Sequence, residues 1–274
     1  MDDPLRERLL GQAHTLINHY WASTLALRQQ ADMEQVHGYR IAARRLRALL
    51  ALWRPLIHDP RLERRLQKAV TRLSALRDEQ VYASQFVHKR AGARSEEQSK
   101  AGRVSQAMVQ AQPRVPMLAV SLDEWLDGVA QVPAGFDPLP WYRLQLGLRL
   151  SLLLNRIEDE QSAKSRKLSN DKLLRQWHKV RLEIKQIRYG TELLVAMGAG
   201  DPEWLSLLGR WQEQLGQLQD GRQWYKRLRR EKSTPKQQRL LRALRKKGRW
   251  QLQRLSCQRG ELVGLSLLML KGDE

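Results

Sequence analysis

A pattern of basic and apolar residues near the N-terminus of this chain occurs a second time, in the same order, 141 residues later. Segment 36–47 reads Val-His-Gly-Tyr-Arg-Ile-Ala-Ala-Arg-Arg-Leu-Arg, and segment 178–188 reads His-Lys-Val-Arg-Leu-Glu-Ile-Lys-Gln-Ile-Arg. Segments 68–78 and 210–220 match in the same way at an offset of 142 residues. The aligned positions are His37 with His178, Arg40 with Arg181, Arg44 with Lys185, Leu46 with Ile187, and Arg47 with Arg188. Two ordered matches at nearly one offset indicate an internal duplication.

The duplication predicts two halves of similar structure. Its period is longer than the repeats of solenoid proteins, which are about 20–50 residues long, so we expect two pseudo-symmetric helical bundles. The loop 132–140 contains proline and glycine and is the expected junction. We therefore expect a single domain over 1–274, with an N-terminal half over 1–132 and a C-terminal half over 138–274.

Prolines divide the chain into long segments that are rich in helix-forming residues. The ten prolines stand at positions 4, 55, 60, 113, 116, 133, 138, 140, 202 and 235, and proline does not continue a helix from its interior. The segments between them are rich in Leu, Ala, Gln, Arg and Lys and show a 3.6-residue apolar period. This period predicts helices near 5–30, 33–57, 60–92, 95–112, 120–131, 139–162, 169–198, 202–232 and 235–257. The predicted fold class is all-α.

The repeated segment places its cations on one face of a helix. With about 100° per residue, His37, Arg40, Arg44 and Arg47 fall within an arc of roughly 80° and climb about 15 Å along the axis. The opposite face carries an apolar stripe that predicts a core contact: Ala42, Ala43, Leu46, Leu49, Leu50 and Trp53. The second copy repeats this arrangement, with Val180, Ile184, Ile187 and Leu194 opposite its cations.

These two basic rows predict a binding site for an anion. Cations three and four residues apart destabilise a helix by tenths of a kcal/mol, so a solvated face usually mixes charges of both signs. The rows contain no carboxylate, and Glu183 lies on another face of its helix. Arginine donates paired hydrogen bonds to phosphate oxygens. The predicted anion-binding residues are His37, Arg40, Arg44, Arg45, Arg47, Lys68, Arg72, His178, Arg181, Lys185, Arg188 and Arg210.

Lys68, Arg72 and Arg210 form a second tier, because each lies on the helix that follows a basic helix. Asp78 and Asp220 end these two segments. They can hold a cationic side chain in position, as supporting residues do at binding sites, or serve as ordinary turn or cap residues. Both interpretations stay open.

The overall charge agrees with an anionic partner. The chain has 49 Lys and Arg against 29 Asp and Glu, a formal net charge of +20, which attracts polyanions. Segment 222–259 alone holds fifteen Lys and Arg, with Glu231 as its sole acid. This segment can extend the anion-binding rows or form a separate surface. The nine tryptophans, such as Trp53, Trp177 and Trp211, are expected to pack in the core.

No catalytic or metal-binding motif accompanies the basic rows. The sequence has no Gly-x-x-x-x-Gly-Lys-Ser/Thr loop, no His-Glu-x-x-His and no acidic cluster for magnesium. We therefore expect a binding protein without cofactor or metal, and not an enzyme. One alternative is a basic helical protein that binds nucleic acid. A second, less favoured alternative is an enzyme that acts on phosphate chains. If neither holds, nucleic acid is expected only as a weak competing polyanion.

The sequence also predicts a cytoplasmic protein that does not use the membrane. No segment approaches the roughly 20 apolar residues of a membrane-spanning helix, and the acidic start lacks the features of a secretory signal. Cys257 is the only cysteine, which suits a reducing compartment.

The ordered motifs resemble those of the CHAD family, the conserved histidine α-helical domain. The likeness rests on the His-x-x-Arg-x-x-x-Arg-Arg-Leu-Arg segment at 37–47, on its counterpart at 178–189, and on Leu-Gly-x-Leu-x-Asp at 215–220 with a variant at 73–78. The resemblance implies two four-helix bundles with a basic cavity between them. It also implies binding of long-chain inorganic polyphosphate by the His, Arg and Lys residues. Association with polyphosphate granules, regulation of polyphosphate metabolism and recruitment of a partner all stay open as biological roles. No Glu-x-Glu-x-Lys strand is present, so the chain resembles the stand-alone form.

Overall fold

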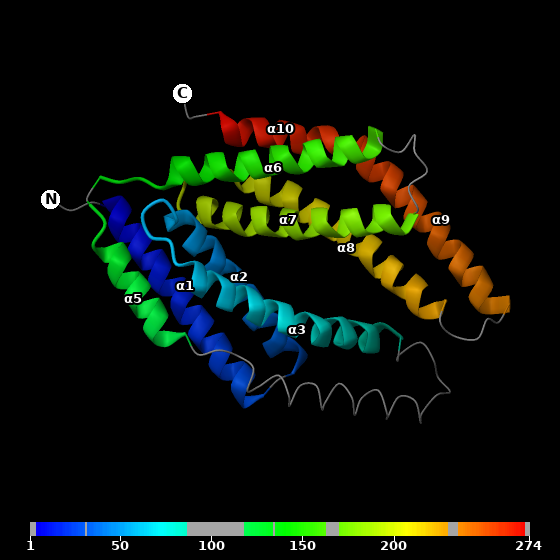
Figure 1. The fold of residues 1–274 in the computed structure, drawn as a ribbon, viewed down its shortest axis with the longest axis horizontal. Helices are drawn as coiled ribbons and strands as arrows, with labels where there is room; N and C mark the ends of the chain where they lie inside the picture. The colour runs from blue at the N-terminus through cyan, green and yellow to red at the C-terminus, as the bar shows by residue number, and fades with distance from the viewer. Residues whose placement is uncertain are drawn as a thin grey trace. The chain divides into compact units, whose positions relative to one another are not determined.

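The computed structural model describes residues 4–30, 32–86, 118–133, 135–162, 170–229 and 235–271. Within these ranges the regular structure is helical and no strand occurs, which confirms the all-α prediction (Figure 1). The chain divides into two compact units, an N-terminal unit (Met1–Pro138) and a C-terminal unit (Leu139–Glu274). The N-terminal unit contains α1 (Pro4–Gln29), α2 (Met33–Trp53), α3 (Pro60–Phe86) and α5 (Ala119–Ala130). The C-terminal unit contains α6 (Leu139–Ser162), α7 (Asn170–Ala196), α8 (Pro202–Leu228), α9 (Pro235–Cys257) and α10 (Arg259–Leu270).

Eight of the predicted helices correspond to helices of the structure. The predicted helix 95–112 lies outside the described residues. Helix α10, a 12-residue helix that packs along α6, was not predicted from the sequence. Its apolar composition over Leu262–Leu270 lacks the polar face that marks an amphipathic helix. None of the described helices is long and apolar enough to cross a membrane.

The two units use the same packing order. In the N-terminal unit α2 packs against both α1 and α3, and α5 lies along α1. In the C-terminal unit α7 packs against both α6 and α8, and α10 lies along α6. Matching positions are buried in both units: Leu46 with Ile187, Leu66 with Leu208, and Leu73 with Leu215. The apolar stripe predicted for each repeated helix is buried as well.

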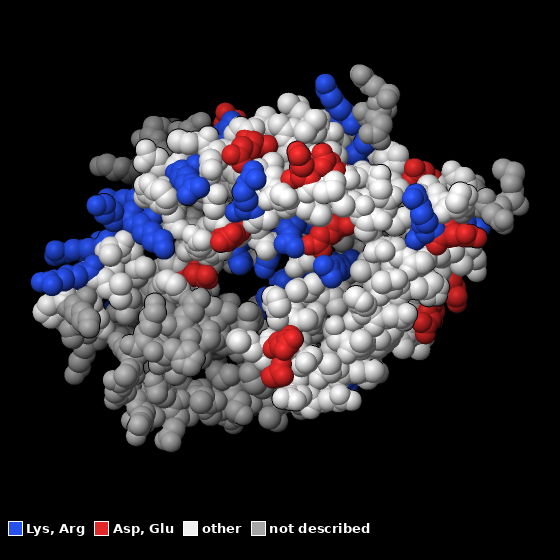
Figure 2. Space-filling view, turned by 180° about the vertical axis from the view of Figure 1, so that it is seen from behind, with Lys and Arg blue, Asp and Glu red and all other residues white. Residues whose placement is uncertain are grey.

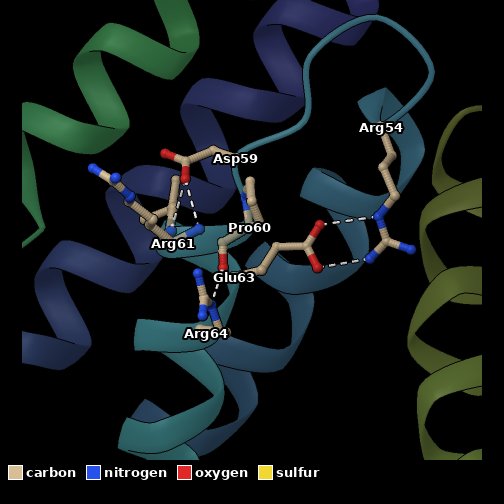
Figure 3. A network of polar contacts seen from close by, with 7 residues as sticks. Arg54, Asp59, Pro60, Arg61, Glu63 and Arg64 are labelled. Carbon is tan, nitrogen blue, oxygen red and sulfur yellow. Dashed lines mark hydrogen bonds and ion pairs between the residues drawn. The ribbon is translucent and has the colours of Figure 1, made fainter.

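The starts of α3 and α8 add a third match between the halves. Asp59 Oδ1 accepts hydrogen bonds from the backbone N–H groups of Arg61 and Leu62, both at 2.9 Å (Figure 3). Asp201, 142 residues later, accepts one from the backbone N–H of Glu203 at 2.8 Å. In both cases proline follows as the first helical residue, where its missing N–H costs nothing. The Asp-Pro pair is therefore a further sign of the internal duplication.

An ion pair closes the turn between α2 and α3. Arg54 donates from Nε and Nη2 to the two carboxylate oxygens of Glu63, at 3.0 and 2.7 Å (Figure 3). This paired geometry is the strongest form of an Arg–carboxylate contact. The turn therefore fixes the C-terminal end of the basic helix α2 relative to α3.

Two buried tyrosines join α1 to α2 on the side away from the basic row. The hydroxyl oxygens of Tyr20 and Tyr39 lie 3.2 Å apart, and both residues are fully buried. Thr24 donates to the backbone carbonyl of Tyr20 at 2.7 Å. Burial raises the pKa of both tyrosines above the ordinary value of 10.0. Because Tyr39 directly precedes Arg40, this contact sets the rotation of α2.

Candidate functional site

The basic row of α2 is not uniformly exposed. His37 is exposed at the start of the row, whereas Arg40 and Arg44 are only 9% and 8% exposed. Arg45 and Arg47 are half-buried. Arg40 and Arg44 are one helical turn apart, so α2 carries two neighbouring cations that are nearly removed from solvent.

Arg44 has no hydrogen-bond or ion-pair partner among the described residues. Burying an unpaired charge costs several kcal/mol, and proteins normally offset this cost with a carboxylate. No carboxylate does so for Arg44 within the described ranges. The Arg44 nitrogens are not among the described side-chain atoms that are both buried and without a hydrogen bond, so an anion from solution can reach this guanidinium.

The basic row of α7 is half-buried throughout. His178, Arg181, Lys185 and Arg188 all lie at intermediate exposure along one face of α7. The four residues of this row include no carboxylate, but Arg188 Nη2 lies 2.5 Å from Glu192 Oε1 one turn later. Glu192 continues the row beyond the repeated segment, where the first copy has alanine.

Glu183 forms an ion pair with α6 and not with the basic row. Its carboxylate lies 2.8 Å from the guanidinium of Arg149 on α6. This contact agrees with its predicted position on another face of α7. The carboxylate is therefore directed to a neighbouring helix, and it leaves the charge of the row in place.

The guanidinium of Arg181 lies across the backbone of α8 at Gly216. A Cβ atom built at Gly216 would lie 3.7 Å from Arg181 Nε and 3.8 Å from Nη2. Gly216 belongs to the Leu-Gly-x-Leu-x-Asp segment that the sequence analysis singled out. The glycine leaves room for the arginine, so the repeated motif on α8 helps to position a cation of α7. Asp220 follows Gly216 by one turn and is half-buried.

The second tier of predicted residues is more exposed. Lys68 and Arg72 of α3 are exposed and have no hydrogen-bond or ion-pair partner among the described residues. Arg210 of α8 is also exposed, but its Nη2 lies 3.7 Å from Glu261 Oε2 at the start of α10. The side chain of Asp78 lies outside the described ones. Lys68 and Arg72 are therefore available to an anion, whereas Arg210 already has an acidic neighbour.

In the described ranges, no group of three or more His, Cys, Asp or Glu side chains is arranged to hold a metal ion. The predicted residues supply hydrogen-bond donors and positive charge. Such a set can bind and orient an anion.

A family model named CHAD domain matches residues 11–229, which include both basic rows. The chain belongs to the CHAD-domain family. The fold agrees: the crystal structure of the CHAD domain from the plant Ricinus communis matches with a TM-score of 0.61 and 19% identity, over 99% of this chain and 93% of that one. PptA from Streptomyces chartreusis matches with a TM-score of 0.50 and 15% identity, over 96% of this chain and 99% of that one. No curated protein matches the chain.

The two halves of this CHAD domain differ in charge. Gln186, Gln214 and Gln219 stand in the second half where the first half has arginine at 45, 72 and 77. The Arg188–Glu192 ion pair further reduces the positive charge of the second row. The first half therefore presents the more cationic site.

Proposed function

We propose that this CHAD domain binds inorganic polyphosphate without catalysis, through the basic rows of α2 and α7. The observation that supports this most strongly is Arg44, a cation that is 8% exposed and has no acidic partner among the described residues. A phosphate chain supplies the missing negative charge. The CHAD family is known for polyphosphate-related ligands, which favours this anion over others.

The chemistry of the rows suits a chain of phosphates. Each row repeats a cation every three or four residues over about 15 Å of helix, so it offers successive contacts to a repeating anion. Arginine donates two parallel hydrogen bonds to one phosphate group. Lys68 and Arg72 extend the first row along α3, and Gly216 lets Arg181 lie close to α8.

Titration calorimetry with long-chain polyphosphate tests the proposal. We expect the quadruple variant R40A/R44A/R181A/K185A to lose binding while its helical circular dichroism is unchanged. A charge-matched control, R8A/R61A/R65A/R156A, removes four exposed arginines that lie outside the rows. It should weaken binding only slightly, through the reduced net charge. If the two quadruple variants lose affinity equally, the rows are not the site.

The non-catalytic part of the proposal has its own test. Incubation of the protein with polyphosphate and divalent metal ions should release no orthophosphate and leave His37 and His178 unphosphorylated. Release of orthophosphate, or a phosphorylated histidine, would show an enzyme.

We further propose that the protein is cytoplasmic and associates with polyphosphate granules, which a fluorescent fusion in polyphosphate-accumulating cells would reveal.

The basic cavity that the family resemblance implies is also part of this proposal. If one phosphate chain contacts both rows, the loss of affinity in the quadruple variant should differ from the sum of the losses in R40A/R44A and R181A/K185A. Residues that share a ligand show such coupling, whereas independent sites add within about 0.5 kcal/mol.

A further inference from the structure

Helix α9 carries a cationic surface that the proposed polyphosphate rows do not use. The helix contains no Asp or Glu, and it follows the end of the family match at residue 229. Seven of its cations are exposed and have no hydrogen-bond or ion-pair partner among the described residues: Arg239, Arg242, Arg245, Lys246, Lys247, Arg249 and Arg254. Figure 2 shows Lys and Arg side chains projecting from the edge of the molecule where α9 lies.

Helix α9 is nevertheless a packed element of the fold. Its inward residues include Leu244, Gln251 and Leu255, of which Gln251 and Leu255 are buried. Gln251 Nε2 lies 3.4 Å from Gln217 Oε1 of α8, the helix on which α9 packs. The outer side thus holds like charges one turn apart, which destabilise a helix unless an anion neutralises them.

Trp250 stands among these cations and differs from the other tryptophans. It is 57% exposed, whereas the other eight are buried or half-buried. Lys246 and Lys247 precede it by one turn, and the Arg254 guanidinium, one turn later, lies 5.6 Å from its ring centroid. The prediction that the tryptophans pack in the core holds for Trp53, Trp177 and Trp211 and is wrong for Trp250.

We propose that the outer side of α9, formed by Trp250 and the seven cations, binds single-stranded nucleic acid. Proteins that bind single strands combine a positive track for the phosphates with aromatic side chains on which bases stack. The α9 surface supplies both within a few turns of one helix. The exposed indole favours a ligand with bases over inorganic polyphosphate, which has none to stack.

A membrane surface fits this helix less well. A helix that lies in a lipid interface needs a broad apolar side to insert. The apolar side of α9 is used against α8, and its outer side has only Leu240 and Trp250 as large exposed apolar residues. The charge and the single aromatic ring therefore favour nucleic acid.

Fluorescence anisotropy with a labelled oligo-dT, and with an abasic strand of equal phosphate number, tests the proposal on the full chain. We expect W250A to weaken oligo-dT binding by about 5- to 150-fold, as the loss of one base–aromatic stack does. Binding of the abasic strand should not change, and W250F should retain part of the oligo-dT affinity. K246Q/K247Q should weaken binding of both strands and reduce the salt slope by about 2.

The matched control for the lysine pair is R61Q/R65Q, which removes two exposed charges from α3. If this control lowers oligo-dT affinity as much as K246Q/K247Q does, α9 is not the binding surface. If wild-type protein binds both strands equally, or W250A weakens both equally, the surface is a general polyanion track and the proposal is wrong. These variants leave the rows of α2 and α7 intact, so polyphosphate binding at those rows is a separate readout.

Discussion

The guanidinium of Arg181 lies against Gly216, with Nε 3.7 Å from the position that a Cβ atom would take. This distance is ordinary van der Waals contact, so one added methyl group fits beside the guanidinium. Gly216 of α8 is therefore a direct neighbour of a cation of the α7 row.

The effect of a substitution at Gly216 on polyphosphate affinity should therefore depend on the size of the new side chain. Gly216→Ala should keep polyphosphate affinity, whereas Gly216→Leu should displace Arg181 and weaken binding by about tenfold, the value of one charge-assisted hydrogen bond. Calorimetry with polyphosphate measures both variants, and thermal unfolding checks that each is folded. Equal affinities for the two variants would show that the position of Arg181 does not matter.

Replacing Arg44 of α2 should raise the stability of the ligand-free protein and weaken its binding of polyphosphate. Arg44→Met keeps most of the side-chain volume and removes a charge that is 8% exposed. Without polyphosphate, the free energy of unfolding should rise by about 1 kcal/mol or more. With polyphosphate at about 100 times its Kd, the free energy of unfolding should increase by about 2.7 kcal/mol for wild type and by much less for the variant. A lower stability of the variant in ligand-free buffer would contradict this account.

The carboxylate of Glu192 should reduce the contribution of the α7 row to polyphosphate affinity. It lies 2.5 Å from Arg188, so Glu192→Gln frees that guanidinium for an anion. Affinity for polyphosphate should rise about two- to fivefold, in line with the energy of a partly exposed ion pair. Glu183→Gln, which changes a carboxylate paired with Arg149, is the control and should have a smaller effect.

Close packing between α6 and α7 should make Gly190→Ala destabilising, because the buried side chains that face Gly190 would have to shift. A Cβ atom there would lie 2.7 Å from Leu146 Cδ2 and 2.8 Å from the Tyr142 hydroxyl. Gly190→Ala should lower the free energy of unfolding by about 1–3 kcal/mol, as overpacked core positions do. Gly209→Ala on α8 meets nothing within 4 Å and should raise stability by up to about 1 kcal/mol. Urea unfolding measures both.

The tyrosine pair should make the N-terminal unit sensitive to high pH. Burial raises the pKa of Tyr39 above the ordinary 10.0 that applies in the unfolded chain. The folded state therefore keeps a proton that the unfolded state loses, and stability should fall as the pH rises above 10. The Tyr39→Phe variant should have a free energy of unfolding about 1 kcal/mol lower than wild type at neutral pH, because it loses the hydroxyl contact with Tyr20. Its stability should fall less steeply above pH 10, which unfolding curves at several pH values would show.

Local patterns predicted the helices and the buried stripes. Helix-forming residues, prolines and a 3.6-residue period act over a few turns, so they are readable without knowing the neighbours. The duplication was also visible, although its Asp-Pro helix starts at 59 and 201 were overlooked. Helix α10 was missed because its apolar segment Leu262–Leu270 shows no amphipathic period.

The sequence by itself determined that the chain is helical, duplicated and strongly basic, and that two helices carry matching rows of cations. Only the tertiary structure decided which of those cations are buried, that Arg188 is paired with Glu192, and that Trp250 lies on the surface. The reason is physical. Periodicity depends on bonds within one helix, whereas burial and charge pairing depend on which other helices pack beside it.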